Sequence, residues 1–171
     1  MKKFFQASVL AAAFLVTVAA VKQQKDIVDI AVSSQAHTTL VAAVKAADLV
    51  STLKSAGPFT VFAPVNDAFA KLPAGTVENL LKPENKATLA KILTYHVVAG
   101  NIDSKAVVAA IEKGKGKAVL TTVSGGKLTA SLDNGKVKLT DENGGTAFVT
   151  AVDLKGSNGV IHVIDGVVLP K

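Results

Sequence analysis

The stretch of residues 57–72, GPFTVFAPVNDAFAKL, constrains the fold more than any other part of this chain. It begins with a Gly-Pro turn and continues into a short apolar run over residues 59–63. Side chains on both faces of this run are nearly all apolar, which is typical of a strand that is buried on both sides. Pro64 ends the strand. Asn66 and Asp67 then stand at the expected start of a helix, as its N-cap and as its first-turn acid.

Two later segments have the same character. Residues 92–100 (ILTYHVVAG) and 158–170 (NGVIHVIDGVVLP) are apolar, β-branched runs that each contain one histidine. The first predicts a central strand that includes Tyr95 and His96 and ends at Gly100. A histidine in an apolar strand is more often a buried residue with hydrogen-bonded ring nitrogens than a ligand. We therefore expect His96 to be structural.

The hydrophobic period changes near residue 117 from helical spacing to alternation. Helices are expected over residues 26–33, 40–56, 68–72, 77–81, 84–94 and 105–113, with N-caps at Thr38 or Thr39, Thr76 and Ser104. Strands are expected over residues 118–123, 127–132, 136–140, 146–154 and 160–165, separated by Gly-Gly and Asn-Gly turns. His37 precedes the second helix and is expected to be exposed. Helices followed by antiparallel strands favour an α+β fold in one domain.

Residues 1–20 have the order of an export signal, with a basic start, an apolar segment and the small residues Ala19 and Ala20. We expect cleavage there, which leaves residues 21–171 as a single domain that is secreted, in the periplasm or outside the cell. The apolar run is also about long enough to span a membrane, so an uncleaved anchor is the alternative. Without Lys2 and Lys3 the net charge falls from +6 to +4.

All 19 basic residues are lysine, and the chain has no cysteine or tryptophan. Disulfides, thiolate metal sites and thiol nucleophiles are therefore excluded. Arginine supplies the bidentate base contacts that nucleic-acid readers favour, so nucleic acid is not an expected partner. The one dense lysine cluster, Lys113, Lys115 and Lys117, is interpreted as a solvated loop. The alternative is a patch for acidic polysaccharide or cell-surface phosphate.

No arrangement of residues predicts catalysis, a metal or a cofactor. Ser104, His96 and Asp67 could be drawn as a triad, but no glycine-framed nucleophile is present. His96 and His162 could be drawn as metal ligands, but neither has a third ligand at the usual spacing. Asn66 and Asp67 have no second carboxylate nearby to support chemistry. We therefore predict a protein that is not an enzyme and holds no cofactor.

Three sequence blocks resemble the fasciclin-like (FAS1) domain, in order and over nearly the whole mature chain. They are residues 60–69, residues 93–96 and residues 158–170. Within them we assign structural roles to Thr60, Phe62, Pro64, Asn66, Asp67, His96, His162 and Asp165. The resemblance implies the FAS1 fold, a twisted antiparallel β-sandwich-like core with several short helices packed along one side. It also implies that polar residues around Asn66 hydrogen-bond to His96. The short leader and single domain are typical of a bacterial member.

The family's roles are cell adhesion and recognition of matrix or surfaces, so the resemblance implies an extracellular protein or polysaccharide surface as partner. Two family motifs linked to integrin binding fall on Tyr95-His96 and on Asp153-Leu154. Asp153-Leu154 is the better candidate for contact, because the polar, glycine-containing residues 155–159 follow it and such runs lie at the surface. Tyr95-His96 has apolar neighbours and is expected to shape the fold.

An alternative function is a carrier that holds a small apolar ligand in a groove between the helices and the sheet. Both functions suit a monomer or weak homo-oligomer, and both are compatible with peripheral association with the membrane or cell envelope. If the protein is an adhesion domain, its structure should show buried histidines and a shallow surface of mixed polarity. A carrier predicts a large dry cavity, and an enzyme predicts a deep polar pocket with converging ionisable groups.

Overall fold

The computed structural model describes residues 24–171, so the expected export signal lies outside the described residues. The helices over this range are α1 (Ile27–Val32), α2 (Thr38–Ala46), α3 (Val50–Lys54), α4 (Asn66–Ala70), α5 (Thr76–Leu80), α6 (Lys86–Tyr95) and α7 (Ser104–Lys113). The strands are β1 (Phe59–Pro64), β2 (Val97–Ala99), β3 (Lys117–Thr121), β4 (Lys127–Asp133), β5 (Lys136–Thr140), β6 (Thr146–Gly156) and β7 (Gly159–Ile164). This order confirms the predicted α+β class.

The strands form one seven-stranded sheet in the order β2-β1-β7-β6-β5-β4-β3. β1 and β7 are parallel, and the other neighbours are antiparallel. A bridge between Val98 and Thr122 brings the two ends of the sheet together, and the Val123 N–H donates to the Val97 carbonyl at 2.7 Å. The sheet therefore curves into a nearly closed barrel, which leaves little unpaired strand edge.

The two faces of β1 belong to two different cores, as its doubly apolar sequence predicts. Phe62 belongs to the cluster that fills the barrel, together with Tyr95 and Leu128. Ala63 belongs to a second cluster, formed between the outside of the sheet and the helices, which also includes Ile161 of β7. β1 and β7 are thus covered on both faces, and this arrangement explains their continuous apolar composition.

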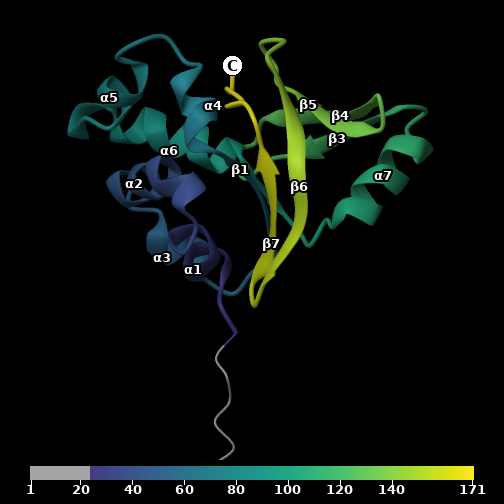
Figure 1. The fold of residues 1–171 in the computed structure, drawn as a ribbon, viewed down its shortest axis with the longest axis horizontal. Coiled ribbons are helices and arrows are strands. Elements are labelled where there is room, and N and C mark those ends of the chain that lie inside the picture. Colours follow the sequence, from purple (N-terminus) through teal and green to yellow (C-terminus); the bar gives the residue numbers. More distant parts are fainter. Residues whose placement is uncertain (1–23) are drawn as a thin grey trace, which may run out of the picture.

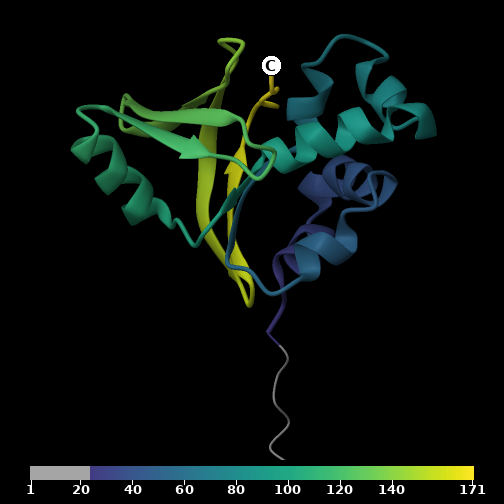
Figure 2. The same ribbon diagram turned by 180° about the vertical axis from the view of Figure 1, so that it is seen from behind.

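Helices α1–α6 gather along one side of the barrel, against β1 and β7 (Figure 1). The view from behind shows the same grouping, with α7 lying apart on the opposite side of the sheet (Figure 2). α7 packs against β3 and β4 and contributes Val107 and Ile111 to the barrel core. The predicted packing along one side therefore describes α1–α6, and α7 covers a different part of the barrel.

The predicted N-caps lie one residue too far along the chain. Asn66, Thr76 and Ser104 are the first residues of their helices, and the cap positions are Val65, Gly75 and Asp103. At α7, for example, the Asp103 carboxylate accepts a hydrogen bond from the Ala106 N–H at 2.8 Å. Asp and Ser are similarly good caps, so where they are adjacent the sequence alone does not decide between them.

Asn66 caps a neighbouring helix instead of its own. α2 begins at Thr38 without a side-chain cap from its own flanking residue His37. The Asn66 Oδ1 accepts hydrogen bonds from the Thr39 N–H at 3.0 Å and from the Thr38 hydroxyl at 3.2 Å. Its Nδ2 donates to the Gln35 carbonyl at 2.9 Å. Asn66 thus fixes α4 to the start of α2, a long-range cap that sequence spacing does not reveal.

Candidate functional site

The candidate contact pair Asp153-Leu154 lies at an irregularity in β6. Ala151 is opposite Val163 of β7 and Leu154 is opposite Ile161, and the register shifts between these pairs. One extra residue is therefore accommodated in β6, as in a β-bulge. Asp153 has a left-handed backbone conformation, with a φ of 59°. Bulges redirect side chains out of the regular alternation, and here the redirected side chain is the Asp153 carboxylate.

The Asp153 carboxylate is bound by the first residue of α7. Ser104 donates from its backbone N–H to Oδ1 at 2.8 Å and from its hydroxyl to Oδ2 at 2.5 Å. These hydrogen bonds lower the pKa of Asp153 below that of an ordinary aspartate, because they stabilise the charged form. A carboxylate has about four acceptor positions, so Asp153 fixes β6 to α7 and retains acceptor positions beyond these two bonds.

The residues on either side of Asp153 are exposed and apolar. Val152 is 44% exposed and Leu154 is 39% exposed. In the following turn Lys155 and Ser157 are exposed, whereas Gly156, Asn158 and Gly159 are half-buried. The surface at the bulge therefore combines two apolar side chains with a polar turn.

An open groove of about 460 Å³ lies beside this turn. It is lined by residues 155–159, by the facing turn of residues 56–58, and by Gln24 and Asn101. Glycine, serine and asparagine dominate its walls, so the groove offers mainly backbone and amide groups. The groove is open and of mixed polar and apolar composition.

Tyr95 and His96 are not in a strand, which corrects the prediction. Tyr95 is the last residue of α6, His96 follows it, and β2 begins only at Val97. The β-branched residues of this segment suit a strand, but helical packing prevails. The Thr94 hydroxyl donates to the Ala90 carbonyl in the preceding turn at 2.7 Å. This hydrogen bond lets a β-branched threonine fit within a helix.

Tyr95 is fully buried and connects α6 to the start of β4 and to the turn between β5 and β6. Its hydroxyl donates to the Lys127 carbonyl at 2.6 Å and accepts from the Glu142 N–H at 3.3 Å. Burial raises the pKa of Tyr95 above its ordinary value. A side chain held in this way stabilises the barrel and presents no surface to a partner.

His96 is also buried, and its hydrogen-bond partners differ from those expected. Nδ1 lies 2.8 Å from the Ile92 carbonyl, to which it must donate, and Nε2 accepts from the Val168 N–H at 3.2 Å. The ring is therefore neutral, and burial holds the pKa of His96 at about 4. The expectation of partners around Asn66 is wrong, because the Asn66 amide is occupied at the start of α2.

Thr60 and His162 fix the segment before α7 to the sheet, and Phe62 packs against His162. The Thr60 hydroxyl donates to the Gly100 carbonyl at 2.7 Å and accepts from the Ile102 N–H at 2.8 Å. His162 Nε2 lies 2.8 Å from the Ile102 carbonyl and donates to it. The Phe62 and His162 rings stack across β1 and β7 with centroids 5.6 Å apart. These contacts stabilise the fold.

Three other predicted residues lie near the ends of β1 and β7. The Asp165 carboxylate accepts from the Phe148 N–H at 2.7 Å, and its carbonyl accepts from Lys71 Nζ at 2.6 Å. Pro64 is buried at the end of β1. Asp67 is exposed in the first turn of α4. Pro64 and Asp165 thus anchor the strand ends, and Asp67 faces solvent.

His37 is buried, which corrects the expectation that it is exposed. Its Nδ1 is 2.8 Å from the Ser34 hydroxyl, and the ring lies beside Ile30 and Ala63. The short 3₁₀ turn Gln35–His37 folds the ring under α1. Burial lowers the pKa of His37, and the nearby Ala63 carbonyl offsets part of this effect. Its Nε2 makes no hydrogen bond within residues 24–171.

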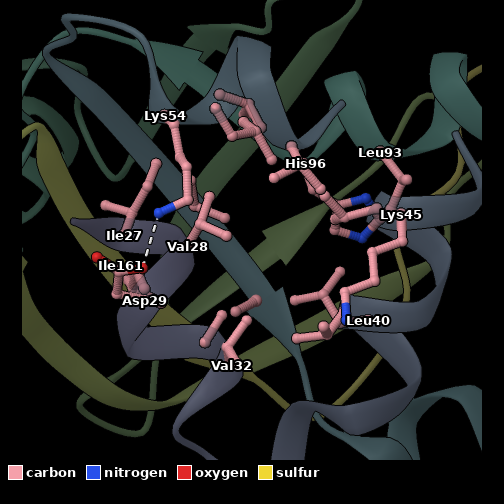
Figure 3. Close-up of a pocket in the computed structure, with 18 residues that line it drawn as sticks. Ile27, Val28, Asp29, Val32, Leu40, Lys45, Lys54, Leu93, His96 and Ile161 are labelled. Carbon is pink, nitrogen blue, oxygen red and sulfur yellow. Dashed lines mark hydrogen bonds and ion pairs between the residues drawn. The ribbon is translucent and has the colours of Figure 1, made fainter. Parts of the chain in front are cut away.

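A cavity of about 260 Å³ lies between α1, α2, α3 and the outer face of β1 and β7 (Figure 3). Aliphatic side chains form most of its walls, among them Ile27, Val28, Leu40, Leu93 and Ile161. Four lining residues are polar: Asp29, Lys45, Lys54 and His96. This is the location that the sequence predicts for an apolar ligand, between the helices and the sheet.

The described residues form neither a catalytic triad nor a metal site. The Ser104 hydroxyl binds Asp153, and both ring nitrogens of His96 contact backbone groups. Within residues 24–171 no three His, Asp or Glu side chains converge in a way that could hold a metal ion. No helix in this range is long and apolar enough to cross a membrane. The lysine cluster at residues 113, 115 and 117 is exposed between α7 and β3.

Comparison with known protein families identifies this fold. The profile of the Fasciclin domain matches residues 35–170. The chain belongs to the fasciclin domain family. The match covers the three sequence blocks on which the resemblance rests, and the nearly closed barrel with its helices is the FAS1 fold.

This fasciclin domain is similar to bacterial proteins and to an insect adhesion protein. Protein sll1483 of Synechocystis sp. is 51% identical over 91% of this chain and 79% of its own length. Immunogenic protein MPT70 of Mycobacterium tuberculosis is 37% identical over 78% of this chain and 63% of its own length. A structure of a FAS1 domain pair from the insect cell adhesion molecule Fasciclin I matches with a TM-score of 0.73 and 20% identity, over 85% of this chain and 51% of that chain. At this identity the match shows a shared fold.

The fasciclin domain family has adhesion and extracellular-matrix roles. The homologues in this family are non-enzymatic adhesion or immunogenic proteins, MPT70 among the latter. Membership of the family therefore confirms the prediction that this chain is not an enzyme.

Asn158 has a larger role in this fasciclin domain than its sequence context suggests. Its Oδ1 accepts from the Ile27 N–H at 3.1 Å, and its Nδ2 donates to the carbonyls of Leu53 at 2.8 Å and Ser55 at 3.0 Å. One side chain thus fixes the β6–β7 turn to α1 and to the end of α3. The Asn-Gly pair indicated only a turn, and no spacing pattern could identify partners so far away in the sequence.

Asp141 is a second residue that sequence reasoning missed. Its Oδ1 accepts from the N–H groups of Asn143 at 2.9 Å and Gly145 at 2.7 Å, and its Oδ2 accepts from the Leu169 N–H at 2.9 Å. The local bonds form an Asx-type turn, which the sequence DENGG could have indicated. The bond to Leu169, which holds the C-terminal segment, has no local signal.

Proposed function

We propose that this fasciclin domain is an adhesion domain that recognises an extracellular protein or polysaccharide surface through the bulge of β6 and the turn beside it. The observation that carries the proposal is the exposure of Val152 and Leu154 on either side of Asp153. Exposed apolar side chains beside a polar turn are typical of the centre and rim of a contact surface. The fasciclin domain family has the matching general role.

The bulge supports this proposal because it is held rigid. Ser104 binds both oxygens of Asp153, and residues 154–156 are paired with β7 on the far side of the bulge. A surface that is already ordered loses little conformational entropy when a partner binds. The groove beside the turn adds backbone donors and acceptors, which suit either a peptide or a sugar hydroxyl.

A contact of this size gives weak affinity, so attachment depends on many copies. Two exposed apolar side chains and one turn bury far less than the roughly 1,200–2,000 Å² of a stable protein–protein interface. Copies presented together on one surface bind more strongly than each does alone. We therefore expect attachment in assays with immobilised protein and weak binding in solution.

The test is attachment of beads coated with the mature domain to extracellular matrix and to polysaccharide surfaces. Val152→Ser and Leu154→Ser together should reduce attachment. Val119→Ser is the matched control, because Val119 is 61% exposed on β3, away from the bulge. Equal attachment by the double variant and the control would exclude the bulge as the contact surface. Absence of attachment by wild type on every surface would contradict the adhesion function.

A second candidate function is carriage of a small apolar ligand, and the cavity beneath α1–α3 favours it. Its volume of about 260 Å³ exceeds the roughly 150 Å³ of a dry cavity that binds benzene. Calorimetric titration with 1-decanol would test it. Val41→Phe, which narrows the cavity, should remove binding, whereas Val119→Phe on β3 should not. Absence of heat for wild type, confirmed by an unchanged melting temperature with ligand, would exclude the carrier.

A further inference from the structure

The size of the cavity limits the length of any occupant. Scaled from a cavity of about 150 Å³ that holds the six carbons of benzene, a volume near 260 Å³ has room for about ten carbons. Side chains from four helices (α1, α2, α3 and α6) and three strands (β1, β2 and β7) line this space. A single alkyl chain of that length would fill the space that the structure offers.

The interior of the cavity offers a ligand no free hydrogen-bond donor or acceptor. Of the four polar lining residues, His96 is uncharged, and its two ring nitrogens are occupied by the Ile92 carbonyl and the Val168 N–H. It therefore presents ring carbons to the cavity and carries no charge at neutral pH. A polar group placed deep in the cavity would lose its hydration without compensation. The buried part of a ligand must be hydrocarbon.

The charged residues of the cavity lie at two different places. Lys54 donates to Asp26 at 2.8 Å and to Asp29 at 2.7 Å, so its charge is more than balanced. The Nζ of Lys45, in the last turn of α2, makes no ion pair or hydrogen bond within residues 24–171. Figure 3 draws this side chain across the cavity from Lys54 and Asp29. The site thus has a neutralised or slightly negative end and an unpaired positive end. An anionic group is favoured beside Lys45 and disfavoured beside Asp29.

We propose that the cavity binds a medium-chain fatty acid of about ten carbons, with its alkyl chain between α1–α3 and the sheet and its carboxylate beside Lys45. This proposal rests on the second candidate function. It adds the class of ligand and names Lys45 as the residue that determines headgroup specificity.

The test compares three ligands that share a ten-carbon chain and differ in headgroup: decanoate, 1-decanol and decylamine. Isothermal titration of the wild-type domain at pH 7 should give decanoate the highest affinity and decylamine the lowest. A solvent-exposed ion pair contributes up to about a fivefold change in affinity, and higher ionic strength should bring decanoate toward decanol. Each ligand is used below its micelle concentration.

Two variants of Lys45 separate the headgroup from the cavity. Lys45→Gln should reduce decanoate affinity by about three- to fivefold and leave decanol unchanged, and Lys45→Glu should reverse the preference toward decylamine. Lys113→Gln is the matched control, because Lys113 also lies in the last turn of a helix, α7, away from the cavity. Equal binding of all three ligands, or tightest binding of decylamine, would overturn the role of Lys45 and leave the carrier function intact. Absence of binding by all three would overturn both.

Discussion

The ring of His96 accepts a hydrogen bond from the Val168 N–H at 3.2 Å, across 72 positions of the chain. Its other nitrogen donates to the Ile92 carbonyl within α6. This one side chain therefore joins the end of α6 to the C-terminal segment that follows β7. A residue that the family resemblance places in an integrin-linked motif acts here as an internal connection.

Replacing His96 with alanine should destabilise the domain. The substitution leaves a buried N–H and a buried carbonyl without partners, at a cost of about 1–3 kcal/mol. In a domain of this size each kcal/mol lowers the melting temperature by about 2–4 °C. Thermal denaturation followed by circular dichroism would measure the change, with Asn101→Ala at an exposed position as the control. An unchanged melting temperature for His96→Ala would refute the structural role.

Stability should fall as the pH decreases from 6.5 to about 4. Burial lowers the pKa of His96 from 6.5 to about 4. Within that window the unfolded chain binds a proton that the folded chain does not. The free energy of unfolding therefore falls by up to about 3 kcal/mol as the pH is lowered from 6.5 to about 4. The lowered pKa of His37 acts in the same direction. Urea unfolding across this range would test it, and His96→Ala should lose most of the dependence. A flat profile for wild type is the contrary result.

The pair Ser104 and Asp153 should show measurable coupling. Ser104→Ala removes the hydroxyl donor and keeps the backbone N–H, whereas Asp153→Asn keeps the shape and removes the charge. A double-mutant cycle at pH 7 should give a coupling energy of about 1 kcal/mol. Because the folded pKa of Asp153 is lowered, its charge contributes stability above the ordinary aspartate pKa, and this is lost as the pH falls through the folded value. Strict additivity of the two changes would contradict the proposed anchoring of the bulge.

Asn158→Ala should cost more than Asn101→Ala, although both residues lie in loops. Asn158 makes three hydrogen bonds to the backbone of α1 and the end of α3. Their loss leaves partly buried backbone groups unpaired, so we expect a loss of about 2–4 kcal/mol in the free energy of unfolding. Chemical denaturation of the two variants would compare them. Similar midpoints would show that solvent replaces these bonds at no cost.

The mature protein should begin near residue 20. The order of basic, apolar and small residues in the first 20 positions predicts export followed by cleavage after Ala19 or Ala20. Mass spectrometry of protein recovered from outside the cytoplasm would give the N-terminus directly. Recovery of the full-length chain in the membrane fraction would instead support the uncleaved anchor.

Much of the fold follows from local sequence patterns. The doubly apolar run at residues 59–63 predicts the buried strand β1, and the alternation after residue 117 predicts the antiparallel strands. These patterns succeed because each reports the environment of its own residues. At Tyr95 and His96 the same β-branched pattern fails, because a helix packed on the sheet can bury such residues as well as a strand can.

The candidate site depends on contacts that no local pattern encodes. Asp153 was recognisable as part of a motif, but the bulge that redirects it and its bond to Ser104 depend on the pairing of β6 with β7. The cavity is likewise formed by α1, α2 and α3 together, and no single helix indicates a void. Asn66 and Asn158 have the composition of local caps and turns, yet their bonds reach other elements.

The parallel pairing of β1 with β7 also determines when the domain can fold. β7 enters the sheet between β1 and β6, so that Phe59 and Gly159, from distant parts of the chain, become neighbours. Such long-range pairing slows folding, because the entropy of closing the intervening loop is lost before contacts between the strands can compensate for it. Helices made early in synthesis have no completed sheet to pack against until the last strand emerges from the ribosome. Together with the predicted export signal, this order of assembly predicts a chain that is still loosely structured when it crosses the membrane.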